Sequence, residues 1–302
     1  MKITAKQKII FSGHHGGIYG LTYGNSSGII YSGSSDKFVG SWNVVSGKQE
    51  EFAIEFPSPV YSLLFLKERN LLLAGTGGGT FHVIDVLAKT ISSTTTLHAG
   101  QIFDLAHSPK HSLIFSGSGD GYFCTINSNT FEKISSTKIC EEKVRSVAVN
   151  SNEDLLAVTG GDGSIHIFSL PDVKEITAFS AHTLSANSVC WHPEGKYLLS
   201  GGRDAHLKVW DAKKNFELIT DIPAHNFAIY HIAYSPDEKL FATASRDKSM
   251  KIWDAETFQL LLRCGKDGQD GHKNSVNRLL WNELGLISGA DDRSMIVWEV
   301  KE

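Results

Sequence analysis

The segment SGGRDAHLKVWD, from Ser200 to Asp211, decides the fold because the chain repeats it. Each strong copy is a run rich in glycine or serine that ends in Asp, and Trp follows six residues later. Strong copies begin at Ser32, Thr243 and Ser288, and weaker ones at Ala74, Ser116 and Val158. The Trp-equivalent positions are 42, 84, 126, 168, 210, 253 and 298, so seven copies of 42 to 45 residues cover the chain.

A second anchor lies upstream of each Asp-equivalent position, at His14, Phe56, His98, Cys140, His182, His225 and His272. The apolar runs that follow are short, rich in Val, Ile, Tyr and Phe, and separated by Gly, Ser, Asn and Asp, which is strand and turn composition. We therefore expect four short strands in each repeat. Such a sheet cannot bury both of its faces alone, so the repeats must pack side by side, and closure into a ring protects the sheets.

Over the whole chain the repeats resemble the WD-repeat β-propellers. The Gly-His signature is kept at Gly13-His14 and Gly271-His272, and the Trp-Asp signature at Trp210-Asp211 and Trp253-Asp254. The resemblance implies an all-β fold: one seven-bladed propeller over residues 1–302, with four antiparallel strands per blade. It also implies that residues 4–11 supply the fourth strand of the blade formed by residues 272–302.

Four repeats contain the same polar set, which the resemblance identifies as a hydrogen-bonded tetrad that ties a loop to its blade. Ser, His and Asp could also form a hydrolase triad. An active site needs one reactive constellation, whereas four near-identical sets indicate one structural device used four times, and histidines spread around a ring do not favour a metal site. The sets are His14/Ser32/Asp36/Trp42, His182/Ser200/Asp204/Trp210, His225/Thr243/Asp247/Trp253 and His272/Ser288/Asp292/Trp298.

The degenerate repeats favour the structural interpretation. The second repeat replaces all four members together, by Phe56, Ala74, Gly78 and Ile84. Joint loss is expected, because an orphaned donor or acceptor in a half-satisfied buried network costs about 1–3 kcal/mol. The fourth repeat keeps Asp162 without a histidine, and we expect its carboxylate to accept backbone amides of its own turn.

Composition excludes several classes of function. Lys and Arg number 29 against 33 Asp and Glu, a net charge of −4 without a basic block, so binding to nucleic acid or anionic membranes by bulk charge is not expected. The first eleven residues lack the apolar stretch expected of a signal peptide, so none is expected, and no apolar run approaches the roughly 18 residues that span a bilayer. The cysteines lack a C-x-x-C pair, which predicts free thiols in a reducing, cytoplasmic protein without cofactor or metal.

A candidate partner site follows from the resemblance, which implies contacts on the top face around the central channel. Residues that flank the first apolar position of each inner strand, or precede the tetrad Asp, point there. They form an aromatic group, Tyr19, Tyr61, Phe103 and Tyr230, and a cationic group, Lys143, Arg145, Arg203 and Arg246. Our hypothesis is a site for a peptide or loop with an apolar residue and a carboxylate or phosphate. In the alternative, the tyrosines plug the channel and the arginines pair with acids such as Asp291.

The function favoured by the sequence is a non-catalytic protein-protein interaction scaffold, a monomeric ring within a larger complex. Two alternatives stay open: a propeller enzyme with a channel metal or acid/base pair, for which His82 and His107 are stray candidates, and an assembly factor in an RNA-processing complex. The Gly/Asp-rich connection from Cys264 to Ser275 predicts a mobile loop, with a Ca²⁺ loop built on Asp267 and Asp270 as the alternative.

Overall fold

The computed structural model describes residues 3–26, 28–265 and 271–301. Within these ranges the chain forms 28 β-strands and a single short 3-10 helix, η1 (Lys67–Arg69). The strands assemble into seven antiparallel sheets of four strands each. These are the blades of a seven-bladed β-propeller fold, which confirms the predicted fold class. The calcium alternative lies outside the described residues, because it needs Asp267 and Asp270.

The chain divides into two compact units, the first comprising Met1–Gly77, Phe81–Thr95 and Ala233–Glu302. It holds most of sheets one, two, six and seven. Sheet one contains β2 (Ile18–Tyr23), β3 (Ile29–Ser34), β4 (Phe38–Asn43) and β5 (Lys48–Glu55). Sheet two contains β6 (Val60–Leu66), β7 (Leu71–Thr76), β8 (Thr80–Asp85) and β9 (Thr90–Thr96). Sheet six contains β22 (Ile229–Tyr234), β23 (Leu240–Ser245), β24 (Met250–Asp254) and β25 (Leu260–Cys264). Sheet seven contains β26 (Val276–Asn282), β27 (Gly285–Ala290), β28 (Ser294–Lys301) and β1 (Thr4–Ser12).

The second unit comprises Gly78–Thr80 and Thr96–Ile232, and it holds sheets three, four and five. Sheet three contains β10 (Ile102–Ser108), β11 (Leu113–Ser118), β12 (Tyr122–Asn127) and β13 (Lys133–Lys138). Sheet four contains β14 (Val147–Val149), β15 (Leu155–Thr159), β16 (Ser164–Ser169) and β17 (Lys174–Ser180). Sheet five contains β18 (Ala186–Trp191), β19 (Tyr197–Gly202), β20 (His206–Asp211) and β21 (Glu217–Pro223). The extent of the predicted single domain, residues 1–302, stays a prediction.

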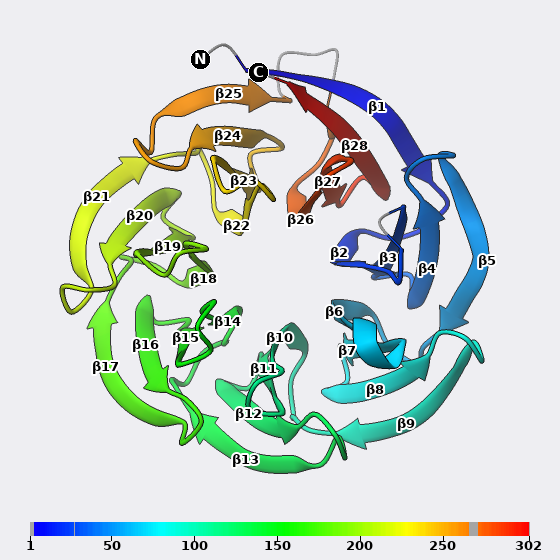
Figure 1. Ribbon diagram of the computed structural model, residues 1–302, viewed down its shortest axis with the longest axis horizontal. Helices are drawn as coiled ribbons and strands as arrows, with labels where there is room; N and C mark the ends of the chain where they lie inside the picture. Colours follow the sequence, from blue (N-terminus) through cyan, green and yellow to red (C-terminus); the bar gives the residue numbers. More distant parts are fainter. Residues whose placement is uncertain (1–2, 27, 266–270, 302) are drawn as a thin grey trace. The chain divides into compact units, whose positions relative to one another are not determined.

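The N-terminal strand completes sheet seven, as predicted. Figure 1 shows β1, in dark blue, alongside β28, in red, and the pairing runs antiparallel from Thr4 opposite Lys301 to Ser12 opposite Ser294. The register shifts between Gln7 and Ile9, so Lys8 is the extra residue of a β-bulge. The strand pairing covers the edge that β28 would otherwise expose.

The core of each unit lies where the first strands of consecutive sheets pack together. In the first unit β2 contacts both β6 and β26, and in the second β14 contacts β10 and β18. Two glycines allow the close approach in the first unit. A Cβ atom added at Gly33 would lie 2.6 Å from Val60 Cγ1, and one at Gly289 would lie 2.7 Å from Ile18 Cγ2. The sheets therefore need glycine at these positions of the strand that carries the tetrad serine.

In the described part of the chain, no helix has the length and apolar character needed to cross a membrane.

Candidate functional site

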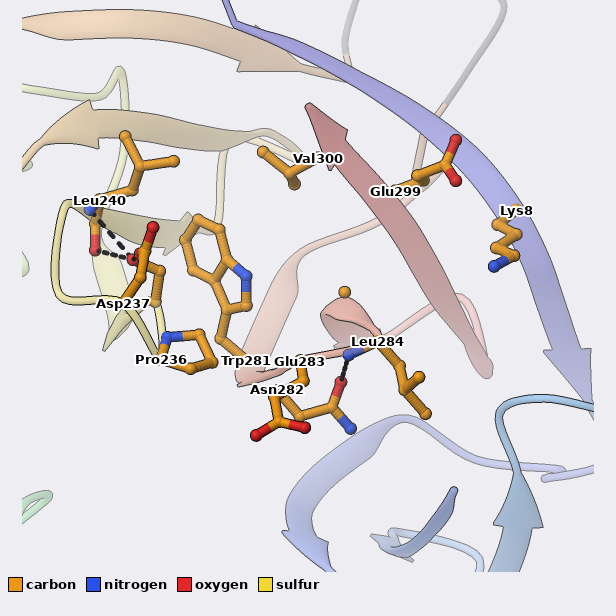
Figure 2. A pocket seen from close by; sticks show the side chains of 12 residues that line it. Lys8, Pro236, Asp237, Leu240, Trp281, Asn282, Glu283, Leu284, Glu299 and Val300 are labelled. Carbon is orange, nitrogen blue, oxygen red and sulfur yellow. Dashed lines mark hydrogen bonds between the residues drawn. The ribbon is translucent and has the colours of Figure 1, made fainter. Parts of the chain in front are cut away.

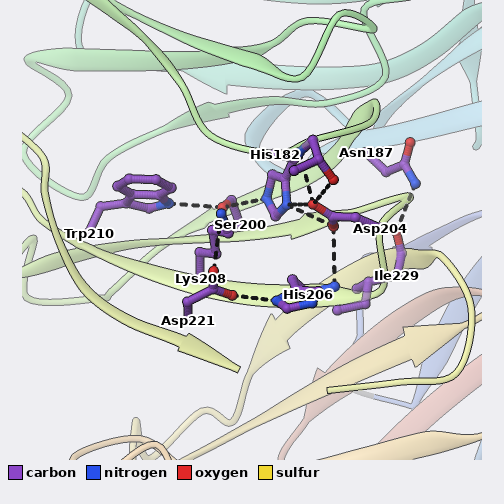
Figure 3. A network of polar contacts seen from close by, with 10 residues as sticks. His182, Asn187, Ser200, Asp204, His206, Lys208, Trp210, Asp221 and Ile229 are labelled. Atoms are coloured by element: carbon purple, nitrogen blue, oxygen red, sulfur yellow. Dashed lines mark hydrogen bonds and ion pairs between the residues drawn. The ribbon is translucent and has the colours of Figure 1, made fainter. Parts of the chain in front are cut away.

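The polar set of sheet five forms one continuous chain of hydrogen bonds (Figure 3). The indole Nε1 of Trp210 donates to Ser200 Oγ over 2.9 Å, and Ser200 Oγ lies 2.9 Å from His182 Nε2. His182 Nδ1 lies 3.0 Å and 3.1 Å from the two carboxylate oxygens of Asp204. A carboxylate only accepts, so Nδ1 carries the proton and the serine hydroxyl donates to Nε2.

Asp204 also closes the turns on either side of the histidine. Its oxygens accept the backbone amide of Thr183 at 3.1 Å and that of His206 at 3.2 Å. The carboxylate thus links the loop that enters sheet five to the β19–β20 turn of the same sheet. This connection is the one that the resemblance implies for the tetrads.

The same chain of contacts recurs in sheets one and seven. His14 lies 2.8 Å from Asp36 and 2.7 Å from Ser32, and Trp42 donates to Ser32 over 2.7 Å. In sheet seven, His272 lies 3.0 Å from an Asp292 oxygen and 2.8 Å from Ser288 Oγ, which accepts from Trp298 over 2.8 Å. In sheet six, Trp253 donates to Thr243 Oγ1 over 3.0 Å. His225 and Asp247 occupy the equivalent places in that sheet, and both side chains are buried.

The electrostatics favour a neutral histidine at His14 of sheet one and an ionised aspartate at Asp204 and Asp292 of sheets five and seven. Burial alone would raise the pKa of Asp204, but the hydrogen bond and charge interaction with His182 and the two backbone amides outweigh it and lower the pKa to about 2. The pKa of Asp292 is lowered in the same way by His272. Burial is the main cause that lowers the pKa of His14 below its usual 6.5.

The tetrad serines are poorly placed for nucleophilic attack. Ser32, Ser200 and Ser288 are completely buried, and each hydroxyl oxygen already accepts an indole N–H. A hydrolase serine must instead reach a substrate carbonyl beside an oxyanion hole. The Ser, His and Asp side chains therefore form a buried network in which they hydrogen-bond to one another and to the tryptophan.

In the degenerate repeats, other side chains and backbone groups make contacts in place of the tetrad. In sheet two, the Phe56 ring meets His82 edge-on with centroids 4.9 Å apart, and His82 Nδ1 bonds to Thr94 Oγ1 at 3.0 Å. His82, a stray catalytic candidate, is thus buried and hydrogen-bonded within its own sheet. In sheet four, Asp162 accepts the backbone amide of Ser164 at 3.0 Å, as expected.

Some of the predicted partner-binding residues contact one another within a compact unit, and they form one group in each unit. In the first unit, Tyr19 and Tyr61 stack with ring centroids 5.1 Å apart and planes inclined by 27°. In the second, the guanidinium carbon of Arg145 lies 4.8 Å from the centre of the Phe103 ring, and Lys143 Nζ lies 5.9 Å from it. Both cations lie over the aromatic ring, and the Lys143 side chain is exposed.

The remaining three candidates lie on other elements of the described chain. Arg203 is exposed in the turn after β19, with its backbone amide bonded to Ser185, and Tyr230 is half-buried on β22. Arg246 is exposed in the turn after β23. All three remain predicted contact residues.

Sequence reasoning missed a second use of the strand position that Tyr19 occupies. In sheet five this position is Asn187, whose Nδ2 donates to the Ile229 carbonyl at 3.1 Å. In sheet seven it is Asn277, which donates to the Ile18 carbonyl at 3.1 Å and to Asp291 at 2.7 Å. Each amide therefore links the first strands of consecutive sheets. Asp291, which the sequence alternative paired with an arginine, accepts a hydrogen bond from Asn277.

Sequence reasoning also missed that Asp104 links neighbouring sheets. It is buried on β10, and its Oδ2 accepts the Ser146 hydroxyl at 3.0 Å and the Val147 amide at 3.2 Å. A lone acidic residue inside the apolar segment IFDLAHS was the signal that could have revealed it. Among the described residues, no group of three or more His, Cys, Asp or Glu side chains could hold a metal ion.

Comparisons with known proteins agree with this geometry. The family described as "WD domain, G-beta repeat" matches residues 5–43, 89–124, 133–169, 173–211 and 216–254, which is more than half of the chain. Residues 44–88 and 255–302 lie outside the match. They nevertheless supply most of sheet two and most of sheet seven, so the structure extends the repeat to seven blades.

Similar proteins include the eukaryotic translation initiation factor 3 subunit I of Caenorhabditis elegans, 22% identical over 58% of this chain and 58% of that protein. The THO complex subunit 3 of Arabidopsis thaliana is 21% identical over 67% of this chain and 65% of that protein. The WD repeat-containing protein 1-A of Xenopus laevis is 24% identical over 67% of this chain and 40% of that protein. The chain thus spans less than two thirds of the length of these relatives. The repeat pattern, the seven sheets and the family match together show that the chain belongs to the WD-repeat family.

Proposed function

We propose that this WD-repeat chain is a non-catalytic interaction scaffold in a multiprotein assembly, and that it binds a peptide or loop of a partner protein. The names of two relatives support the assembly role, since each denotes a subunit of a larger complex. The buried, occupied tetrad serines support the absence of catalysis. The proposal includes a cytoplasmic location without cofactor, supported by four cysteines that are free thiols.

The observation that carries the proposed contact is the grouping of Phe103, Lys143 and Arg145. The ring of Phe103 offers an apolar surface, and the two cations lie within 6 Å of its centre. A partner segment with an apolar side chain and a nearby carboxylate or phosphate could contact both the ring and the two cations. Aromatic and arginine side chains also contribute most to the binding energy at protein interfaces.

The stacked pair Tyr19 and Tyr61, together with Tyr230, Arg203 and Arg246, supplies the further contact residues that we propose. Tyrosine gives a large contact area for the loss of few rotatable bonds. The carboxylate or phosphate of the partner would select the cationic residues.

The test is affinity purification with mass spectrometry, using the tagged full chain and the double variant Lys143→Ala/Arg145→Ala. The matched control is Lys174→Ala/Lys213→Ala, which removes the same charge from exposed lysines on β17 and in the β20–β21 turn. We expect the first variant to lose a partner that the control retains, with an unchanged unfolding midpoint for both. Equal capture by the two variants would refute the proposed contact.

A second assay addresses the chemistry of the partner. Once captured, the partner is treated with phosphatase, or its acidic residues near the contact are replaced by amides. The proposal predicts that one of these treatments weakens binding to the wild-type chain. Binding that neither treatment weakens would refute the proposal that the cationic residues recognise a carboxylate or phosphate.

A further inference from the structure

Two adjoining pockets in the first compact unit are lined by none of the tetrad or partner-binding residues assigned above. The first has a volume of about 490 Å³ and is lined by the turns that follow β22 and β26, together with β1 and β28. The second, of about 520 Å³, shares Pro236, Trp281, Asn282 and Glu283 with it. Because they share four lining residues, the pockets form one groove, lined by Tyr23, Tyr234 and Trp281 as well as by polar residues.

Trp281 presents an unused hydrogen-bond donor to this groove. Its side chain lies in the core with Leu240 and Leu286, and the residue is only 7% exposed. Figure 2 shows the indole nitrogen on the side of the ring that faces away from Leu240 and into the pocket. Among the described residues, none accepts a hydrogen bond from this nitrogen.

The equivalent tryptophan of sheet five shows what this position does when it serves only the fold. Trp191 lies nine residues after His182, as Trp281 lies nine residues after His272, and it is also 7% exposed. Its indole Nε1 donates to the backbone carbonyl of Ala148 over 2.9 Å. A buried indole N–H normally has such a partner, so Trp281 is the exception of the pair.

Tyr23 fixes Trp281 from the neighbouring sheet. Its hydroxyl donates to the Trp281 backbone carbonyl, and burial raises the pKa of Tyr23 to about 12, so the donor keeps its proton. Tyr23 also lines the second pocket, together with Tyr234 and Pro236. The backbone of Trp281 is thus tied to Tyr23 at the place where the two pockets share their lining.

The rim of the first pocket is acidic. Glu299 pairs with Lys301 at 3.0 Å, and Lys8, the bulge residue of β1, lies close enough to interact with its charge. Asp237 and Glu283 then remain as the negative charges of the lining. Glu283 is exposed and has no ion pair or hydrogen bond with a described residue, so its carboxylate is available to a cation.

We propose that this groove binds an extended, proline-containing segment of a partner protein that carries an adjacent arginine or lysine. A polyproline II segment leaves its backbone carbonyls without internal hydrogen bonds and stacks its prolines on aromatic and proline side chains. One carbonyl accepts from Trp281 Nε1, and the basic side chain pairs with Glu283 and Asp237. The inference concerns a surface distinct from the Phe103 group and does not depend on it.

The experiment measures fluorescence anisotropy of labelled synthetic peptides with the full chain. The first peptide repeats Pro-Pro-Arg, the second replaces Arg by Glu, and the third replaces Pro by Ala while it keeps Arg. We expect binding of the first alone. Failure of the first peptide to bind at concentrations up to about 1 mM, or equal binding of either other peptide, would overturn the proposal.

Variants assign the binding to the groove. Trp281→Phe keeps a ring but removes the N–H, and we expect about fivefold weaker binding with little change in unfolding midpoint. Trp191→Phe is the matched control: it removes a structural hydrogen bond, so it should lower the unfolding midpoint and leave peptide affinity unchanged. Glu283→Lys should weaken binding at least as much as Trp281→Phe. Wild-type affinity in either groove variant would refute the assignment, and Arg145→Ala should leave the affinity unchanged.

Discussion

Replacement of Asp204 by Ala tests the structural role of the polar sets with a built-in comparison. The substitution leaves the Nδ1–H of His182 without an acceptor, and the His182 side chain is completely buried. An unsatisfied buried donor costs about 1–3 kcal/mol. The pKa of Asp204, lowered from 3.8 to about 2, independently corresponds to about 2 kcal/mol of native-state stabilisation. We therefore expect a loss of about 2–3 kcal/mol in the free energy of unfolding.

Asp162 provides the control, because it occupies the same position in sheet four but has no histidine partner. Its carboxylate is exposed, and its described bonds are to the backbone and hydroxyl of Ser164. Asp162→Ala should cost less than about 1 kcal/mol, in the range of surface changes that remove a turn hydrogen bond.

Urea unfolding followed by tryptophan fluorescence measures both variants at pH 7. The free energies are compared at equal denaturant slope, so that a change in midpoint reports a change in stability. Equal losses for Asp204→Ala and Asp162→Ala, or a loss below about 0.5 kcal/mol for the first, would refute the reasoning.

Further predictions concern pH, the N-terminal strand and the second repeat. Burial lowers the folded-state pKa of His14 and His98 below 6.5. The contribution of these neutral histidines to the free energy of unfolding is therefore complete above pH 6.5 and is lost as the pH falls below it. A rise in the urea midpoint from pH 7 to pH 5 would contradict this. The contribution of Asp204 is present above about pH 3.8 and should disappear as the pH falls toward 2, which the same titration checks. Deletion of residues 1–11 uncovers the edge of β28 and should cause aggregation in light scattering; a monomeric protein with unchanged melting would contradict it. Gly78→Ala should destabilise less than Asp204→Ala, because Gly78 has no positive φ, unlike Gly79; equal melting losses would count against that distinction.

Much of the fold was predictable because the sequence repeats with a period of 42 to 45 residues, one repeat for each blade. The Trp-equivalent positions fall on the third strand of six sheets and on β28 of the seventh, and the pairing of β1 with β28 is the one that the resemblance to the WD-repeat propellers implied. The resemblance to the WD-repeat propellers implied which tetrad side chains meet, and the recurrence of the set in four repeats favoured a structural role over catalysis. Period and recurrence predicted seven sheets of short strands, whereas the closure by β1 and the bonding within each tetrad came from the resemblance.

The candidate sites were less predictable, because they depend on how one sheet meets the next. Tyr19 and Asn277 occupy equivalent strand positions, yet one stacks on Tyr61 and the other bonds to the Ile18 carbonyl. Trp191 and Trp281 have the same spacing from their histidines, and only the structure distinguishes a bonded indole from one that faces a pocket. Repeat spacing defines a position in a sheet, whereas the neighbouring sheet defines its use.

The most direct test of the structural role of the tetrads is a double-mutant cycle between Ser200 and Trp210. Ser200→Ala, Trp210→Phe and the double variant are compared by urea unfolding, because Trp210→Phe removes the N–H that Ser200 Oγ accepts at 2.9 Å. If the set acts as one buried unit, the two changes are coupled by about 1 kcal/mol or more. Losses that add to within about 0.3 kcal/mol would show that the two side chains do not act together in holding the sheet.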